Sequence, residues 1–304
     1  MKAPDGNKLA ILNALNQGGF VSGQVLGEQL GISRAAVSKH IQTLQDMGLD
    51  IFKVTGKGYS LNNAVGLLNR DDITKHYHAL GANTAQVEVH PIIDSTNSEL
   101  MRRIQNKVAL ESGTVVVAEM QQAGRGRRGR VWQSPFGANL YYSYFWRLDD
   151  GLQAAMGVSI AVGLAVYDAI KALYDIDIEL KWPNDIYINK QKLAGVLVEL
   201  DGQPQGPCQL VIGIGINLQM PQNTSEHIDQ AWTDLSQHTT ALDKNQLVAS
   251  LTFYLEQRLA DYQQDGLNSM YAQWNALNAF AGECVELNTG HRSWRGICEG
   301  IDQH

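Results

Sequence analysis

Residues Gly124–Gly129 read GRGRRG, and this stretch combines two residue types that often contact phosphate. Arginine makes charge-assisted, frequently bidentate hydrogen bonds to phosphate and carboxylate groups, and glycine lets the backbone approach a ligand closely. The spacing also fits G-x-G-x-x-G, the fingerprint of a dinucleotide-binding turn. Three interpretations are therefore open: a dinucleotide-binding turn, a basic patch for nucleic acid, or a loop that closes over a charged ligand.

The sequence around this stretch argues against the dinucleotide-binding turn. Such a turn needs a strand before it and a helix directly after it, because the helix N-terminus holds the pyrophosphate. Residues 114–120 (TVVVAEM) are typical of a strand, but Pro135, Gly137 and an alternating aromatic run follow, and these indicate a second strand. A basic patch does not explain why the arginines are isolated in an acidic domain. We therefore expect a mobile arginine loop between two strands, over a ligand that the residues alone do not name.

The length and composition of the chain are those of a globular protein with about two domains. It has 304 residues, 44% of them hydrophobic and 18% charged, and a net charge of −7. With this charge, any contact with nucleic acid requires a local basic surface. The three cysteines form no C-x-x-C pair, and no signal peptide or membrane span is apparent, so we expect a cytoplasmic protein with reduced thiols.

The first 60 residues are typical of a DNA-binding module. Residues 33–44 predict a helix with Ser33 as its N-cap and an apolar inner face, and TGKG within residues 49–61 predicts a hairpin wing. Residues 1–60 contain six basic and four acidic residues, a net charge of +2. The segment resembles the winged helix-turn-helix of bacterial repressors, although a plain three-helix bundle with a solvated face is the alternative. The residues expected to meet DNA are Ser33, Arg34, Ser38, Lys39 and Lys57.

Five sequence blocks follow this module. They are STN at 95–97, QQAGRGRRGR at 121–130, SPFGANLY at 134–141, KWPNDIYINKQKLAGVLVEL at 181–200 and GIGIN at 213–217. In this order, and behind a winged helix, they make nearly the whole chain resemble the bifunctional biotin–protein ligases that also repress the biotin operon (the BirA family). Lipoate ligases share the fold, but the arginine loop and the KWPND block favour biotin.

The resemblance implies an activity, its substrates and its partners. The family joins biotin to ATP, with Mg²⁺, to give biotinyl-5′-AMP and pyrophosphate, and then transfers biotin to a lysine of biotin carboxyl carrier protein. When the carrier is scarce, the adenylate-bound protein forms a homodimer and represses biotin synthesis genes at an operator with two half-sites. Two alternatives stay open: a repressor that senses a ligand without catalysis, and a lipoate-type ligase.

The family's ligand contacts are implied at matching positions of this chain. Those implied for biotin are Ser95, Thr96, Asn97, Gln121, Arg125, Gly126, Arg127 and Lys192, of which Lys192, Arg125 and Arg127 are implied to act in catalysis. Those implied for ATP or the adenylate are Trp132, Lys181, Asp185 and Asn217. Plainer roles compete: Ser95 as a helix N-cap, Asp185 as a turn cap and Trp132 as a core residue. Metal ligands do not follow from the sequence.

The expected architecture is α+β in three parts. Residues 1–63 form the winged helix-turn-helix, with Asn62 and Asn63 closing the wing. Residues 66–278 form a biotin/ATP-binding ligase domain with a mixed sheet and helices on one face, and residues 181–200 predict a hairpin within it. Residues 279–304, with short strands after Ala281, resemble an SH3-like C-terminal domain that looks truncated. By resemblance, the ligase domain is similar to class II aminoacyl-tRNA synthetases, and residues 217–232 form a second loop that the adenylate orders. Glycine within a strand often marks the close approach of a ligand, and we note Gly195, Gly213 and Gly215.

Overall fold

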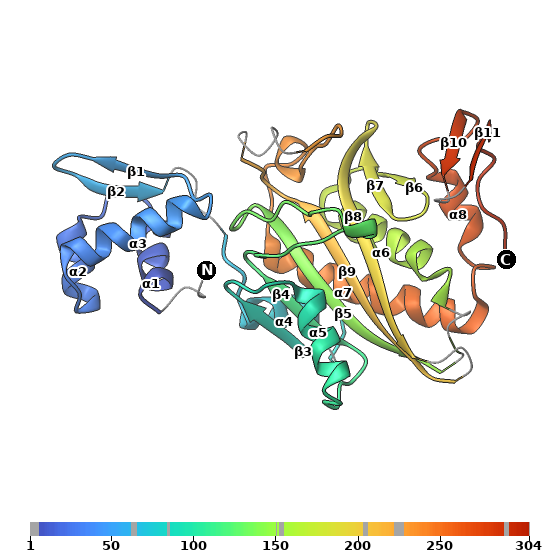
Figure 1. Ribbon diagram of the computed structural model, residues 1–304, viewed down its shortest axis with the longest axis horizontal. Coiled ribbons are helices and arrows are strands. Elements are labelled where there is room, and N and C mark those ends of the chain that lie inside the picture. Colours follow the sequence, from blue (N-terminus) through green and yellow to red (C-terminus); the bar gives the residue numbers. More distant parts are fainter. Residues whose placement is uncertain are drawn as a thin grey trace.

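The computed structural model describes residues 6–61, 66–83, 86–149, 151, 155–202, 206–221, 228–288 and 292–303. Figure 1 shows three parts in a row: a small N-terminal domain, a large domain built on a central sheet, and a C-terminal hairpin. None of the helices in these ranges is long and apolar enough to cross a membrane.

The N-terminal domain is a winged helix-turn-helix. It consists of α1 (Gly6–Asn16), α2 (Gly23–Leu30), α3 (Arg34–Asp46) and the antiparallel pair β1 (Ile51–Val54) and β2 (Gly58–Leu61). The Ser33 hydroxyl accepts a hydrogen bond from the backbone N–H of Ala36 and caps α3, as predicted. The predicted helices and wing are confirmed. The expected closure of the wing by Asn62 and Asn63 lies outside the described residues.

The large domain is built on a seven-stranded sheet of order β3-β4-β5-β9-β8-β7-β6. The strands are β3 (Gln86–His90), β4 (Thr114–Ala118), β5 (Asn139–Leu148), β6 (Glu179–Lys181), β7 (Asp185–Ile188), β8 (Gln191–Gly202) and β9 (Cys208–Asn217). β3 and β4 run parallel and the other neighbours antiparallel, so the sheet is mixed as predicted. Residues 181–200 contain the predicted hairpin, which turns at Asn189 and Lys190.

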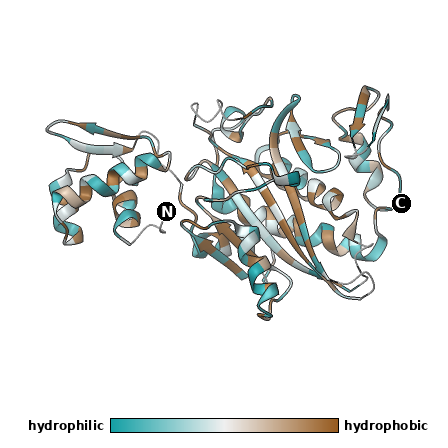
Figure 2. Ribbon diagram, viewed as in Figure 1, coloured by the Kyte–Doolittle hydropathy of each residue, from teal (hydrophilic) through white to brown (hydrophobic). Residues whose placement is uncertain are grey.

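Helices pack on both faces of this sheet, whereas the sequence predicted one face. The long helices α6 (Val158–Tyr174) and α7 (Lys244–Asp265), with α4 (Arg70–Ala79), cover one face, and α5 (Thr96–Gln105) covers the other (Figure 1). β4 shows why: Val115 and Val117 belong to the large core, while Val116 packs with α5. A strand that is apolar at every position is buried on both sides. Figure 2 shows the hydrophobic residues of these strands and of the helices over them.

The C-terminal segment packs beside the β7–β8 hairpin. It contains α8 (Tyr271–Ala276) and the antiparallel strands β10 (Cys284–Asn288) and β11 (Ser293–Ile297), so the short strands predicted after Ala281 are present. Lys190 at the hairpin turn lies 2.9 Å from Glu283, and its amine is 4.4 Å from the centre of the Phe280 ring. These contacts attach the C-terminal segment to the sheet.

Candidate functional site

The residues implied for ligand binding meet around two adjoining cavities. The larger, of about 620 Å³, is lined by Ser95, Thr96, Asn97, Gln121, Arg125, Gly126, Arg127, Trp132, Lys181, Asp185 and Lys192, among others. The smaller, of about 320 Å³, is lined by Asn217 and shares Trp132 and Lys192 with the larger. The fold thus places side chains from positions 95 to 217 around one site, although they come from four of the sequence blocks and from Trp132, which lies between two of the blocks.

Three polar residues of the larger cavity, Thr96, Asn97 and Gln121, form a hydrogen-bonded cluster with the buried Ser143, and these four residues are called the floor here. The backbone N–H of Thr96 donates to Oε1 of Gln121 at 2.9 Å, and the Ser143 hydroxyl lies 2.7 Å from Oγ1 of Thr96 and 2.5 Å from Oδ1 of Asn97. Thr96, Asn97 and Ser143 are at most 4% exposed. Polar groups this deeply buried need hydrogen-bond partners, so the floor is a preformed polar network within an apolar sheet.

Helix α5 positions the floor. Ser95 caps the helix, because its hydroxyl accepts from the backbone N–H of Ser98 at 3.4 Å, and Thr96 and Asn97 form the first turn. Asp94, just before the cap, is bound by Arg102 of the same helix, and this hydrogen bond holds the pKa of the Asp94 carboxyl below its ordinary value. The N-cap role that competed for Ser95 in the sequence is present, and the residue also lines the cavity.

Two strand glycines make room for side chains at this site. A Cβ at Gly213 would lie 2.4 Å from Oδ1 of Asn97, and a Cβ at Gly215 would lie 2.6 Å from Cε2 of Trp132. The sequence predicted the close approach of a ligand; within the structure it is Asn97 and Trp132 that approach so closely. Trp132 lies against the sheet between the two cavities, and its Nε1 is buried without a hydrogen-bond partner among the described residues.

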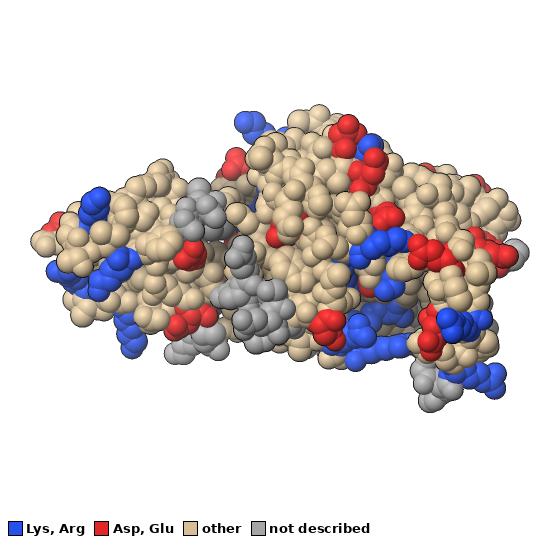
Figure 3. All heavy atoms as spheres, turned by 90° about the horizontal axis from the view of Figure 1, so that it is seen from above, with Lys and Arg blue, Asp and Glu red and all other residues tan. Residues whose placement is uncertain are grey.

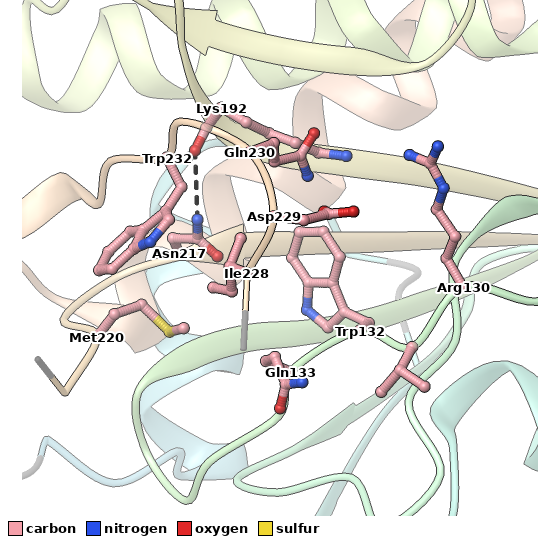
Figure 4. A pocket seen from close by; sticks show the side chains of 11 residues that line it. Arg130, Trp132, Gln133, Lys192, Asn217, Met220, Ile228, Asp229, Gln230 and Trp232 are labelled. Carbon is pink, nitrogen blue, oxygen red and sulfur yellow. Dashed lines mark hydrogen bonds between the residues drawn. The ribbon is translucent and has the colours of Figure 1, made fainter. Parts of the chain in front are cut away.

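Lys192 stands where the two cavities join. Its Nζ lies 2.7 Å from Oδ1 of Asp185 and 5.6 Å from the centre of the Trp132 ring, and its side chain is 12% exposed. Figure 4 shows the lysine beside Trp132, with Trp232 to one side and Arg130 to the other. Asp185 therefore serves as the charge partner of Lys192 in the structure.

The arginine loop, residues 124–132, connects β4 to β5. Its backbone is tied to itself, because the N–H of Gly126 donates to the carbonyl of Arg130 at 2.7 Å and that of Trp132 to the carbonyl of Gly124 at 3.0 Å. A short 3-10 turn, η1 (Arg127–Gly129), lies at its tip, and the next regular element is the strand β5. No helix follows the glycines, so the prediction that this is no dinucleotide-binding turn is confirmed.

Three arginines of the loop reach three different walls of the cavity. Arg125 donates to both carboxylate oxygens of Glu199 on β8, at 2.9 and 3.0 Å. Arg127 donates to Oδ1 of Asn184 before β7, at 3.0 Å, and Arg128 donates to the carbonyl of Asn288 on β10, at 3.2 Å. The loop therefore spans the larger cavity and is held by polar contacts at its side chains.

Lys181 and Asn217 line the cavities, and each also forms hydrogen bonds to other residues of the protein. The Lys181 amine donates to the Tyr187 hydroxyl at 2.9 Å. The Asn217 amide donates to the backbone carbonyls of Lys192 at 3.3 Å and Thr233 at 3.0 Å, and Figure 4 shows the first of these bonds. Both residues thus have structural partners besides any ligand.

The larger cavity is rich in positive charge. Its lining includes four arginines and two lysines, with Asp185 and Glu286 as the acidic residues among those described. Figure 3 shows lysine and arginine side chains gathered around a hollow in the large domain, apart from a second group on the N-terminal domain. The described residues contain no group of three or more His, Cys, Asp or Glu that could hold a metal ion by themselves. The hollow suits an anionic ligand.

Several residues that line the larger cavity or bind the arginines of its loop were not singled out from the sequence. Asn184, Glu199 and Asn288 bind the loop arginines, and Tyr141 and Tyr142 of β5 line the larger cavity. Burial raises the pKa of both tyrosine hydroxyls well above the ordinary value, so they remain neutral. Only Glu199 had a visible signal, because it is an acid within the otherwise apolar run GVLVEL.

The residues expected to meet DNA lie on the surface of the N-terminal domain. Ser33, Arg34, Ser38 and Lys39 are exposed at the start of α3, and Lys57 is exposed at the tip of the wing, 5.7 Å from the centre of the Phe20 ring. The start of α3 and the wing are the elements with which this fold contacts DNA.

The segment after the arginine loop links the two domains. Phe136, which is 4% exposed, belongs to the core of the N-terminal domain, and its backbone N–H donates to the carbonyl of Met47 at 3.3 Å. Met47 directly follows α3. Three residues therefore lie between Trp132, which lines both cavities, and Phe136, which packs at the end of α3.

Comparisons with known proteins agree with this architecture. Residues 89–217 match the biotin/lipoate A/B protein ligase family, and residues 7–60 match a helix-turn-helix (HTH) domain. The chain is 45% identical to the bifunctional ligase/repressor BirA of Salmonella typhimurium, over 97% of this chain and 89% of that one. It is 32% identical to the protein of the same name from Bacillus subtilis, over 93% of this chain and 87% of that one.

A solved structure shares the fold of the large domain. The biotin protein ligase from Aquifex aeolicus in complex with biotin and ATP superposes with a TM-score of 0.61 at 25% sequence identity. The match covers 72% of this chain and 89% of that chain.

Proposed function

The chain belongs to the family of bifunctional biotin–protein ligases and repressors, and on that basis we propose how its cavity works. Biotin binds with its ureido ring at the floor, and ATP binds with its phosphates beneath the arginine loop. The carboxylate of biotin attacks the α-phosphorus of ATP, pyrophosphate leaves, and biotinyl-5′-AMP forms. A neutral lysine amine of a carrier protein then attacks the acyl carbon, and AMP leaves.

The observation that supports this assignment is that the cavity has neutral polar groups in one region and positively charged groups in another. A buried set of hydroxyl and amide groups lies at the floor, and the amine of Lys192 and the loop arginines lie further along the same cavity. A ureido ring offers two N–H donors and one carbonyl acceptor, which match hydroxyl and amide groups. The dithiolane of lipoate offers neither, and it would leave buried polar groups unpaired. The floor therefore favours biotin over lipoate.

Lys192 and the arginine loop supply the electrostatic part of catalysis. Carboxylate attack on a triphosphate gathers negative charge at the reacting atoms, and fixed cations in a partly closed site stabilise it. Lys192 exchanges its Asp185 partner for ligand oxygens when biotin and ATP bind. Asp185 is then free to orient the incoming lysine amine, and Trp132, which lines both cavities, offers its ring to the nucleotide.

Mg²⁺ enters with the triphosphate in this proposal. Mg²⁺ is usually bound through one or two carboxylates together with substrate phosphates, so a cavity that holds Asp185 and Glu286 suits it without a dedicated protein cage. When bound, the ion would neutralise part of the phosphate charge, and Asp185 and Glu286 are the carboxylates that would hold it, while Lys192 and the arginines hold the phosphate oxygens. The partners that we propose are biotin carboxyl carrier protein and operator DNA, in the cytoplasm.

Pyrophosphate release tests the ligase assignment. The protein is incubated with Mg-ATP and either biotin or lipoate, and pyrophosphate and the adenylate are measured. We expect release with biotin and a rate near background with lipoate. Equal release with lipoate would favour a lipoate-type ligase, and no release despite biotin binding would favour the ligand-sensing repressor.

We further propose that the adenylate controls DNA binding through a homodimer. The support is the short path from Trp132 to Phe136, which packs in the N-terminal core beside Met47. Ordering of the loop by a ligand acts on the same segment that contacts the end of α3, and a ligand shifts an equilibrium between forms that it binds with different affinities. The polar loop expected at 217–232 also belongs to this proposal, although residues 222–227 lie outside the described ranges.

Binding to DNA upstream of the biotin synthesis genes of the same genome tests this coupling. Gel-shift and sedimentation measurements are made with the protein alone, with biotin, and with biotin plus ATP. We expect tighter DNA binding and a dimer only when the adenylate forms. DNA binding that is indifferent to biotin and ATP would contradict the coupling and leave the ligase assignment intact.

A further inference from the structure

Glu199 connects the arginine loop to the floor. It lies on β8, and its side chain is 25% exposed. Its carboxylate accepts from Arg125 through both oxygens, and Oε2 also accepts from Nδ2 of Asn97 at 2.8 Å. One carboxylate is thus shared by the loop that covers the cavity and by the buried end of the cavity.

The carboxylate also determines which way the Asn97 amide faces. An ionised carboxylate accepts hydrogen bonds and donates none, so the amide nitrogen of Asn97 must face Glu199. The nitrogen also reaches the carbonyl of Leu197, at 3.3 Å. Oδ1 of Asn97 is therefore left facing the hydroxyl of Ser143, at 2.5 Å.

The acceptor of the Ser143 hydroxyl proton is then defined. Its hydroxyl lies close to two oxygens, Oδ1 of Asn97 and Oγ1 of Thr96, but it carries a single proton. Because Oδ1 has no proton of its own, Ser143 donates to Asn97, and the Thr96 hydroxyl donates to Ser143. Oγ1 of Thr96 also lies 3.2 Å from Oε1 of Gln121, but its single proton is needed in the shorter 2.7 Å contact with Ser143, where Ser143 has no proton left to donate. Oε1 of Gln121 then accepts only the Thr96 backbone N–H within this network and keeps a lone pair.

We propose that Glu199 is a positioning residue of the biotin site, which holds Arg125 over the cavity and, through Asn97 and Ser143, makes the floor an acceptor of N–H groups. Thr96 and Gln121 both line the cavity, and in this arrangement the side-chain oxygen of each keeps a lone pair for a ligand. The ureido N–H groups of biotin are the matching donors. The inference rests on the proposed function and adds a residue to it that does not touch the ligand.

Biotin binding without ATP tests the inference, measured by calorimetry on the full chain. Glu199→Ala removes the hydrogen bonds to Arg125 and to Asn97. We expect biotin affinity to fall by about 10- to 100-fold, the range for loss of a hydrogen-bonded charge. Glu199→Gln can still turn its oxygen to Asn97 but places an NH₂ group beside Arg125, so we expect a smaller loss of about 3- to 10-fold. Asp168→Ala is the matched control, because Asp168 pairs with Arg258 at similar burial and neither residue lines the larger cavity.

A double-mutant cycle distinguishes positioning from a general structural role. Thr96→Val removes the hydroxyl at the end of the chain of hydrogen bonds, so Glu199→Ala should weaken binding much less in the Thr96→Val background than in the parent. Melting temperatures identify any variant that fails to fold, and Glu199→Gln, which has nearly the same shape, then carries the test. Additive losses, or Glu199 variants that bind biotin like the parent, would overturn the inference. A parent chain that does not bind biotin would instead overturn the proposed function.

Discussion

The floor and the arginine loop bound the same cavity, and they differ in burial and in what holds them. Thr96 and Asn97 of the floor are 3% and 4% exposed, and they are fixed by a helix cap, by strand glycines and by one another. The Arg125 side chain of the loop is 42% exposed, and at the tip of the loop Arg127 and Arg128 reach Asn184 and Asn288 through side-chain hydrogen bonds. The difference indicates separate roles for the two regions. The floor, which is buried and fixed, recognises the neutral ureido ring, and the more exposed loop binds the charged phosphates.

The first prediction concerns Lys192, which joins the two regions. Lys192→Ala removes the amine that lies between Asp185 and Trp132, and we expect adenylate formation to slow by about 10²- to 10³-fold, as for other groups that stabilise developing charge. Biotin affinity without ATP should fall far less. Single-turnover pyrophosphate release and calorimetry separate the two effects. Lys171→Ala, at an exposed ion pair on α6, is the control. Equal losses in binding and in rate would show that Lys192 belongs to the floor.

The second prediction perturbs the floor alone. In Gly213→Ala the new Cβ would lie 2.4 Å from Oδ1 of Asn97, so the amide must move. We expect biotin affinity to drop at least about tenfold and stability to fall by about 1–3 kcal/mol, the usual range for overpacking. Gly66→Ala, which meets no atom within 4 Å, is the control. Unchanged biotin binding in Gly213→Ala would remove the floor from the biotin site.

The third prediction perturbs the loop alone. Arg127→Gln removes the charge and, because its side chain is shorter, the contact with Asn184. We expect the KM for ATP to rise, or the rate of pyrophosphate release to fall, by about tenfold. Melting temperature and biotin affinity without ATP should stay close to the parent values. A variant with weakened biotin affinity and normal ATP kinetics would reverse the division between floor and loop.

The fourth and smallest prediction concerns the stability of α5, the helix that positions the floor, in acid. Hydrogen bonds from Arg102 lower the pKa values of Asp94 and Glu99 on and beside α5, and Arg103 lowers that of Glu88. Since these carboxyls are more acidic in the folded chain, their stabilisation is present above their ordinary values of 3.8 and 4.5 and is lost as the pH falls below them. The pairs are partly exposed, so the contribution of each is about 1 kcal/mol or less.

Melting temperature against pH checks this effect. Arg102→Gln should lower the melting temperature at pH 7 by a few degrees and flatten its decline below about pH 4.5. Arg147→Gln is the control, because Arg147 and its partner Asp149 are 60% and 66% exposed. If the melting temperature of Arg102→Gln declined below pH 4.5 as steeply as that of the parent, the carboxyl groups on and beside α5 would not account for the loss of stability in acid.

Local signals in the sequence predicted much of the fold. Ser33 and the inward residues of α3, and the turn between β7 and β8, depend on interactions within a few residues, so the pattern indicates them directly. The face of the sheet that α5 covers is different, because the apolar stripe of a helix does not specify its partner. The run Val115–Val117 held that information, since three consecutive buried positions require cover on both faces.

The same distinction between local and long-range interactions applies to the candidate site. The blocks that line the cavities could be recognised in the sequence, because each block is local. The contacts that join them could not, since Arg128 and Asn288 are 160 positions apart and Phe136 reaches Met47 in another domain. Glu199 shows the limit most clearly. Its place in β8 was visible, but its role depends on Arg125 and Asn97, which only the tertiary structure brings to it.

The central claim is that one cavity binds biotin at the floor and the phosphate beneath the loop, with Lys192 between them. A crystal structure of the chain with a hydrolysis-resistant biotinyl-adenylate analogue tests it most directly. We expect the ureido ring within hydrogen-bond distance of Thr96 and Gln121, and the phosphate oxygens facing Lys192 and the loop arginines. A ureido ring under the loop with the nucleotide at the floor, or an analogue bound outside both cavities, would contradict it.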